Sequence, residues 1–132
     1  MTRFVIDAPT LLAVVTGEHV VAPGHQLVAP NLLRSQALAL LFADVRGGRL
    51  TETEAMARHE DLTALKVRLL GDRVSRRVAW QIAREHGFHS TVDAEYLAVT
   101  RLQADAYVTV DAQARARAEG IVPVGTLDQL FA

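Results

Sequence analysis

Two short apolar runs near opposite ends of the chain each lead into an aspartate and then into a helix-like segment. Residues 3–7 (RFVID) and residues 106–111 (AYVTVD) have the pattern of buried strands. The segments between them have helical composition and are separated by glycine and proline. Short strands that alternate with helices are typical of an α/β protein. The sequence therefore predicts one α/β domain over residues 1–132, with a small central parallel sheet flanked by helices.

End signals place the helices along the chain. Thr51 and Glu54 have the spacing of a capping box, and Asp72 is a suitable cap for the helix after it. Residues 17–29 contain Pro23 and Gly24 and are predicted to be a loop. The helices are expected at residues 8–15, 31–45, 51–70, 73–86, 94–103 and 112–119, with a last short strand at 121–124 and a helical turn at 126–131. We interpret the pair between about residues 30 and 70 as a helical hairpin inserted into the unit.

Composition excludes several classes of protein. The chain has no cysteine, which excludes disulfides, thiolate catalysis, zinc fingers and iron–sulfur clusters. Its formal net charge of −1 excludes a protein that attaches to nucleic acid through overall charge alone. The N-terminus does not resemble a signal peptide, and the lack of cysteine is compatible with a reducing compartment. We therefore expect a cytoplasmic protein.

The longest apolar run covers residues 37–43 and is far too short to span a membrane. Because the run would be apolar on every side of a helix, it predicts either a fully buried helix or part of a dimer interface. The buried helix is the favoured interpretation.

Three aspartates carry the strongest functional signal. Asp7 and Asp111 follow the two predicted strands, and Asp93 precedes a predicted helix. The carboxyl ends of parallel strands meet at one edge of a sheet, where ligand crevices form. Carboxylates gathered there repel one another, and a hard divalent cation such as Mg²⁺ or Mn²⁺ relieves that repulsion. Taken singly, each aspartate is better explained as the cap of the helix that follows it, so the metal-site interpretation rests on the whole arrangement.

Four segments, taken in order, resemble the motif set of PIN domains. They are residues 4–7 (FVID), 29–36 (APNLLRSQ), 93–98 (DAEYLA) and 107–111 (YVTVD). The resemblance covers nearly the whole chain and is greatest to the small stand-alone PIN proteins of VapC type, the toxins of bacterial toxin–antitoxin pairs. No single motif is specific, and the order and spacing of the motifs carry the resemblance.

The resemblance implies a PIN-like fold and a metal-dependent endoribonuclease that is a homodimer, cleaves RNA with Mg²⁺ or Mn²⁺ and is restrained by a small antitoxin protein. Asp7, Asp93 and Asp111 match the acidic metal-binding and catalytic positions, and Thr109 matches the hydroxyl that supports the last aspartate. Such a site would activate a water molecule for attack on the phosphodiester, without a protein nucleophile.

One position departs from the family pattern. The family usually has a glutamate on the second helix, where this chain has Gln36. An amide oxygen can ligate a metal or hold its water, but it brings no negative charge. Asp105 is a second-ranked acid that could support the site. The alternative to a nuclease is therefore a PIN-fold protein with weakened or lost catalysis that binds RNA or protein as a regulatory module.

Other folds with an aspartate at the end of a strand lack their partner residues here. A phosphohydrolase of the haloacid-dehalogenase type needs a second aspartate where Pro9 stands, and a response-regulator receiver needs a lysine after a late strand. The only lysine is Lys66, in a predicted helix, and residues 8–10 are not the glycine-rich turn of a dinucleotide fold.

The helix at residues 73–86 has a stripe of arginines with one aromatic residue. Arg73, Arg77, Trp80 and Arg84 are spaced to share one face. Such a stripe suits contacts to phosphates and bases, but a solvated charged face beside a partly buried tryptophan is the slightly favoured interpretation. The neighbouring face, expected to pack in the core, consists of Val74, Val78 and Ile82.

Overall fold

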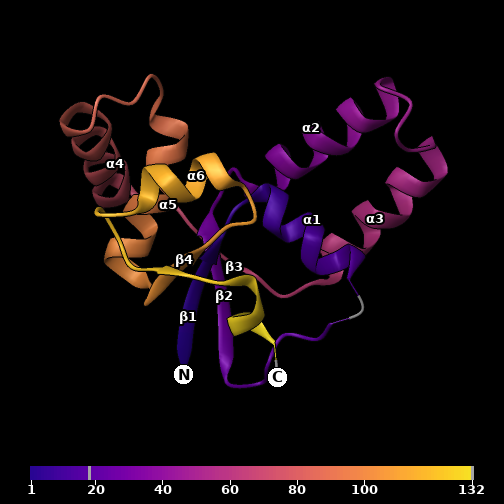
Figure 1. Ribbon diagram of the computed structural model, residues 1–132, viewed down its shortest axis with the longest axis horizontal. Coiled ribbons are helices and arrows are strands. Elements are labelled where there is room, and N and C mark those ends of the chain that lie inside the picture. The colour runs from indigo at the N-terminus through magenta and orange to yellow at the C-terminus, as the bar shows by residue number, and fades with distance from the viewer. Residues whose placement is uncertain (18, 132) are drawn as a thin grey trace.

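A five-stranded parallel sheet forms the centre of the structure, a computed structural model that describes residues 1–17 and 19–131 (Figure 1). Its spatial order is β3-β2-β1-β4-β5. The strands are β1 (Thr2–Ile6), β2 (His25–Pro30), β3 (Arg68–Leu70), β4 (Ala106–Val108) and β5 (Val124–Gly125). Strands β2 and β3 thus lie on one side of β1, and β4 and β5, which come later in the chain, lie on its other side.

Helices connect the strands and cover the sheet. They are α1 (Ala8–Thr16), α2 (Leu33–Arg46), α3 (Glu52–Ala64), α4 (Arg73–Glu85), α5 (Thr91–Gln103) and α6 (Ala112–Ala118), followed by the short 3₁₀ helix η1 (Leu127–Leu130). Helices α1, α2 and α3 pack together, whereas α5 packs on β1, β2 and β4 and carries α4 on its outer side. Figure 1 shows these two groups on opposite sides of the strands.

The central strands are buried on both faces. Val5 and Ile6 in β1, Leu27 and Val28 in β2, and Val108 in β4 are almost completely shielded from solvent. Consecutive buried residues are expected where helices cover both faces of a parallel sheet, because neighbouring side chains on a strand point to opposite faces. This packing fixes the ends of β1 and β4, from which the functional residues extend.

The predicted α/β architecture with its small parallel sheet and helical hairpin is confirmed and is consistent with a PIN-like fold. Two strands were not predicted. Residues 25–30 form β2 rather than loop, and the helix expected over residues 51–70 ends at Ala64 and is followed by β3. Both strands have weak sequence signals, since β2 begins with His25 and Gln26 and ends in a proline, and β3 has three residues.

The predicted helix starts are confirmed at α3 and α4 and wrong at α5. Thr51 and Glu54 form the capping box of α3, and Asp72 caps α4. Helix α5 begins earlier than expected, because the Ser90 hydroxyl accepts the Val92 N–H and serves as the cap. Asp93 therefore lies inside the first turn of α5 rather than in front of it.

Two further segments near the chain ends differ slightly from expectation. Strand β4 ends at Val108, so Thr109 and Val110 form a short connection to Asp111. The strand expected at residues 121–124 occurs at Val124–Gly125 instead. The helical turn expected near the C-terminus is present as η1.

The apolar run at residues 37–43 is only half buried. Ala37 and Leu41 lie in the core, but Leu38 is exposed and Phe42 retains 65% of its accessible surface. The interpretation of this run as a fully buried helix is therefore wrong, because one side of α2 faces outward. None of the helices formed by residues 1–17 and 19–131 has the length and apolar character needed to cross a bilayer.

Candidate functional site

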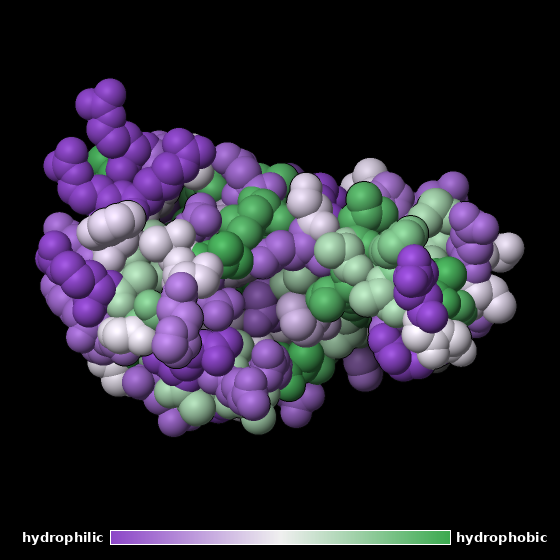
Figure 2. Space-filling view, turned by 90° about the horizontal axis from the view of Figure 1, so that it is seen from above, coloured by the Kyte–Doolittle hydropathy of each residue, from purple (hydrophilic) through white to green (hydrophobic). Residues whose placement is uncertain are grey.

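The site lies where the order of the sheet reverses, between β1 and β4. In open parallel sheets a crevice forms at such a point, beyond the carboxyl ends of the strands, because the connections leave in opposite directions. Here the crevice is a pocket of about 330 Å³. Figure 2 looks onto this end of the molecule and shows a hollow between the α2–α3 side and the α4–α6 side. Its lining includes Asp7, Gln36, Asp93, Tyr96, Tyr107, Asp111 and Arg117.

Asp7 is the most constrained residue of the site. It follows β1, caps α1 and keeps only 6% of its surface accessible. Its Oδ1 accepts hydrogen bonds from the backbone N–H and the hydroxyl of Thr10. Its Oδ2 accepts hydrogen bonds from the hydroxyls of Tyr107 and Thr109, each at 2.6 Å. The Asp7 carboxylate therefore caps α1 and also lines the pocket, and four hydrogen-bond donors hold it in place.

Two threonine hydroxyls connect Asp7 to the segment after β4. The Thr10 hydroxyl accepts the Val110 N–H at 3.1 Å, and the Thr109 hydroxyl accepts the Asp111 N–H at 3.1 Å. Both hydroxyls also donate to Asp7, so each bridges the carboxylate and the backbone. Thr109 thus supports both aspartates, and Thr10 joins Asp7 to the connection that follows β4.

Two tyrosines form the inner wall. Burial raises the pKa of Tyr107 above its usual value, and the Asp7 charge adds to the effect. Burial likewise raises the pKa of Tyr96, with a further contribution from the Asp7 charge. Both hydroxyls therefore stay protonated and act as donors, that of Tyr107 to Asp7 and that of Tyr96 to the amide oxygen of Gln36.

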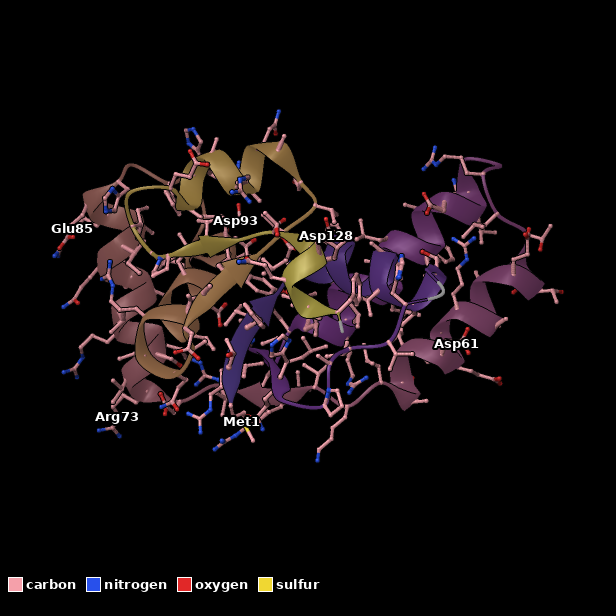
Figure 3. The ribbon with its side chains drawn as sticks, turned by 60° about the horizontal axis from the view of Figure 1, so that its bottom comes forward. Met1, Asp61, Arg73, Glu85, Asp93 and Asp128 are labelled. Carbon is pink, nitrogen blue, oxygen red and sulfur yellow. The ribbon has the colours of Figure 1, made fainter. Side chains whose placement is uncertain are left out.

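Asp93 and Asp111 lie on the outer wall of the pocket. Asp93 Oδ2 is 3.3 Å from Nη2 of Arg117, and both side chains are well exposed, at 56% and 39%. Asp111 caps α6 by accepting the Gln113 N–H on Oδ1 at 3.0 Å. Figure 3 shows Asp93 near the middle of the molecule, between α5 and α6. Both residues keep solvent-facing carboxylate surface, unlike Asp7.

The donor set fits one hard divalent cation in charge and ligand type. The charged side chains that line the pocket are three carboxylates and one guanidinium, a formal total of −2. The carboxylates are not gathered into a ready-made ligand cluster, since no group of three metal-binding side chains is close enough together in the described parts of the chain. A cation would take the exposed oxygens of Asp93 and Asp111 and draw on the fixed charge of Asp7.

The remaining residues predicted for the site lie elsewhere. Asp105 is exposed at the amino ends of the strands, opposite the pocket, where its Oδ2 accepts the Arg3 N–H at 2.7 Å. Its predicted supporting role is wrong, because it precedes β4 whereas the pocket lies beyond the end of that strand. The α4 stripe is outside the pocket and exposed. Val74 is 58% exposed, so its predicted place on the core face of this helix is wrong.

Three pocket residues were not predicted from the sequence, namely Tyr107, Tyr96 and Arg117. Tyr107 had a usable signal, because it precedes Thr109 by two residues and the two therefore point the same way along an extended segment. Tyr96 could have been placed by its position one helical turn after Asp93. Arg117 had no local signal, since its ion pair joins the far end of α6 to the start of α5.

Comparison with known proteins extends the fold assignment. No protein-family model matches the chain, and no curated protein matches it. The chain is similar to the crystal structure of PAE2754 from Pyrobaculum aerophilum, with a TM-score of 0.70 and 21% sequence identity over 98% of this chain and 93% of that one. At this level of identity the likeness establishes a shared fold across the described chain.

Proposed function

We propose that the protein is an endoribonuclease of PIN type that uses Mg²⁺ or Mn²⁺ and acts in the cytoplasm as the toxin of a toxin–antitoxin pair. The observation that carries the proposal is the convergence of Asp7, Asp93 and Asp111 on one pocket at the sheet's reversal point. Three carboxylates at the edge of a parallel sheet match the resemblance found in the sequence and the ligand preference of these cations.

The residues of the pocket have different roles in the proposed reaction. Four hydrogen bonds hold Asp7 in one orientation, so its charge is available without reorganisation. Asp93 and Asp111 supply exposed oxygens, and Arg117 brings a guanidinium that can pair with a phosphate oxygen. The bound cation would polarise the phosphodiester and lower the pKa of its water.

The decisive experiment compares three single charge removals. Asp93→Asn and Asp111→Asn should each reduce Mn²⁺-dependent cleavage of RNA by at least about 100-fold, because a lost ligand costs more than a lost outer contact. Asp105→Asn is the matched control, since it makes the same change in an exposed aspartate at the opposite edge of the sheet. Cleavage is measured on total RNA and on a labelled single-stranded oligonucleotide.

Two results would reject the proposal. One is native protein that cleaves no RNA at any concentration of Mg²⁺ or Mn²⁺. The other is cleavage that the Asp93 and Asp111 variants retain at the level of the Asp105 control, which would identify a contaminating nuclease.

A second function is favoured by one observation, the state of Gln36. Its amide oxygen accepts the Tyr96 hydroxyl, so the position that is usually a glutamate contributes a neutral, occupied acceptor to the pocket. In this alternative the protein has weakened or lost catalysis and binds RNA or protein as a regulatory module.

Gln36→Glu separates the two functions. If the site is weakened, a glutamate should restore a fourth negative charge and raise metal-dependent cleavage by tenfold or more. High cleavage by the native protein, with no gain in the variant, would show that three carboxylates suffice. Gln103→Glu is the control, because it makes the same change at an exposed position at the end of α5 that does not line this pocket.

The proposal includes two protein partners, which are a small antitoxin and a second copy of the chain. The exposed apolar side chains of α2 and α3, including Leu38, Phe42 and Met56, surround a groove of about 450 Å³. We assign this surface to the homodimer, since an exposed apolar patch of this kind is typical of an interaction site.

A further inference from the structure

One arc of α4 consists of arginine and tryptophan alone. With about 100° between successive residues of a helix, the five residues fall within an arc of about 100°. They are Arg73, Arg76, Arg77, Trp80 and Arg84. All five are exposed, and we name this surface the α4 arc. Figure 3 shows Arg73 at one end of α4, at the edge of the molecule and away from Asp93.

The tryptophan of the α4 arc is largely exposed. Trp80 keeps 64% of its surface accessible, although the same helix buries Ala79, Ile82 and Ala83 against its neighbours. Arg76 and Arg84 lie one helical turn before and after it, so guanidinium groups flank both sides of the indole. An exposed indole flanked by guanidinium groups presents an aromatic face on which a planar ligand can stack.

No arginine of the α4 arc forms an ion pair within the part of the chain that the structure describes. Among the residues that the structure describes, ion pairs join Asp44 with Arg49, Arg115 with Glu119 and Asp93 with Arg117, and none involves α4. The only acid within α4 is Glu85, at its last position and outside the arc. In a chain whose net charge is −1, the α4 arc therefore concentrates four positive charges on one helix face, with the exposed cap Asp72 as the acid beside its first turn.

We propose that the α4 arc binds a single-stranded segment of RNA, with the arginines on its phosphates and Trp80 stacked on a base. Arg73 and Arg84 are about 16 Å apart along the helix axis, enough for a short run of nucleotides. Stacking on an exposed indole needs an unpaired base, and the flanking arginines supply the charge that such surfaces use to track a backbone.

The identity of this RNA as substrate rests on the proposed nuclease function. The arc and the pocket belong to neighbouring helices, because α4 packs along α5 and the first turn of α5 carries Asp93. A segment held on the α4 arc would be bound by a positive surface, whereas the pocket itself is negative.

The test uses the fluorescence of Trp80, which is the only tryptophan of the chain. Single-stranded RNA of mixed sequence is added to the full-length protein in EDTA, which suppresses metal-dependent cleavage. We expect quenching of the indole emission that saturates, and binding that weakens with salt. A duplex RNA of the same charge should bind without comparable quenching, because its bases are already stacked.

Variants of exposed residues then locate the surface. Replacing Arg73, Arg77 and Arg84 together by alanine should weaken binding at least tenfold and reduce the slope of log affinity against log salt by about 2. Trp80→Ala, followed with labelled RNA, should weaken binding about tenfold. The control replaces Arg46, Arg68 and Arg101 by alanine, which removes the same charge from exposed positions outside α4.

Three outcomes overturn the inference: native affinity in the triple α4 variant, equal weakening in the control, and equal quenching by poly-glutamate of matched charge. The last would reassign the arc to an acidic polypeptide. RNA binding through the α4 arc without any metal-dependent cleavage would leave this inference standing and reject the nuclease proposal. Metal-dependent cleavage with a KM that the α4 substitutions do not change would support the nuclease proposal and overturn this inference.

Discussion

At the scale of single residues, Arg117 controls how negative the pocket is. Its guanidinium pairs with Asp93, one of the two carboxylates that keep exposed oxygens. The same contact competes with a cation for Asp93 and keeps the pocket's formal charge at −2 instead of −3.

Arg117→Gln should therefore bind Mn²⁺ more tightly, by about tenfold, since it removes a positive charge beside the ligands. Titration calorimetry with MnCl₂ measures this independently of cleavage. Arg101→Gln, an exposed arginine of α5 outside the pocket, serves as the control. Unchanged or weaker Mn²⁺ affinity in Arg117→Gln would contradict the competition.

Tyr107 makes stability depend on alkaline pH. Burial and the Asp7 charge raise its pKa above the value of about 10 that it has in the unfolded chain. Its contribution is fully present below about pH 10 and is lost as the pH rises toward the raised folded pKa, because only the unfolded chain releases the proton.

Tyr107→Phe should remove part of this loss. Above about pH 10 the free energy of unfolding of the native protein should fall by up to about 1.4 kcal/mol per pH unit for each of the two buried tyrosines. In the variant only Tyr96 should contribute to this fall. Urea unfolding across this range measures the slopes. The variant should also be less stable by about 2 kcal/mol at neutral pH, where Asp7 lacks one donor. Equal alkaline slopes in both proteins would show that Tyr107 has an ordinary pKa.

At the scale of secondary structure elements, Thr10 ties α1 to the connection between β4 and α6. Its hydroxyl donates to Asp7 and accepts the Val110 N–H, and the side chain is fully buried. Thr10→Val keeps the shape of the side chain but removes both interactions. We expect a loss of about 2 to 3 kcal/mol in the free energy of unfolding, measured by chemical denaturation.

Thr16→Val provides the matched comparison for that substitution. Thr16 lies at the exposed end of the same helix, where its hydroxyl bonds to the Leu12 carbonyl oxygen. The exposed site should change stability by less than about 0.5 kcal/mol. Similar losses at the two positions would show that the buried bridge contributes nothing specific.

Elements with strong local signals were predictable, and those defined by their neighbours were not. The capping box at Thr51 and the cap at Asp72 satisfy free N–H groups within a few residues, so the sequence reveals them. Strand β3 has three residues and exists because it pairs with β2, which is a long-range interaction. Ser90 precedes Asp93 by three residues, a spacing that makes Ser90 a plausible cap, and the preference for Asp93 there was wrong.

The same distinction applies to the site. Asp7 and Asp111 were predicted as site residues because each follows a recognisable strand, and Thr109 was predicted as a supporting hydroxyl from the resemblance to PIN domains. Arg117 was not predicted, since its contact with Asp93 depends on how α6 lies over α5. The sequence thus identifies the acids of the pocket but not the cation among them.

At the scale of the whole molecule, two ends of different character flank the pocket. Figure 2 shows hydrophilic side chains gathered over the α4 end and hydrophobic side chains over α2 and α3. We propose RNA as the ligand of the α4 arc and a second copy of the chain as the partner of the apolar surface around Phe42. This arrangement leaves the pocket open between them.

Phe42→Glu should prevent self-association. Sedimentation velocity over a range of concentrations is expected to show a dimer for the native chain and a monomer for the variant, because a charge in an apolar interface is left unpaired. Gln81→Glu, at an exposed position of α4, should remain a dimer. A native chain that stays monomeric at every concentration would reject the homodimer.

The pairing of β1 with β4 also has a consequence for synthesis on the ribosome. Asp7 and Thr109, which share a hydrogen bond, are separated by 102 positions in the chain. Contacts this distant form late, since the intervening chain must first be made and folded. A nascent or prematurely terminated chain would carry Asp7 without the hydroxyls that hold it. The pocket can therefore be assembled only after β4 has been synthesised, so incomplete products would lack the proposed activity.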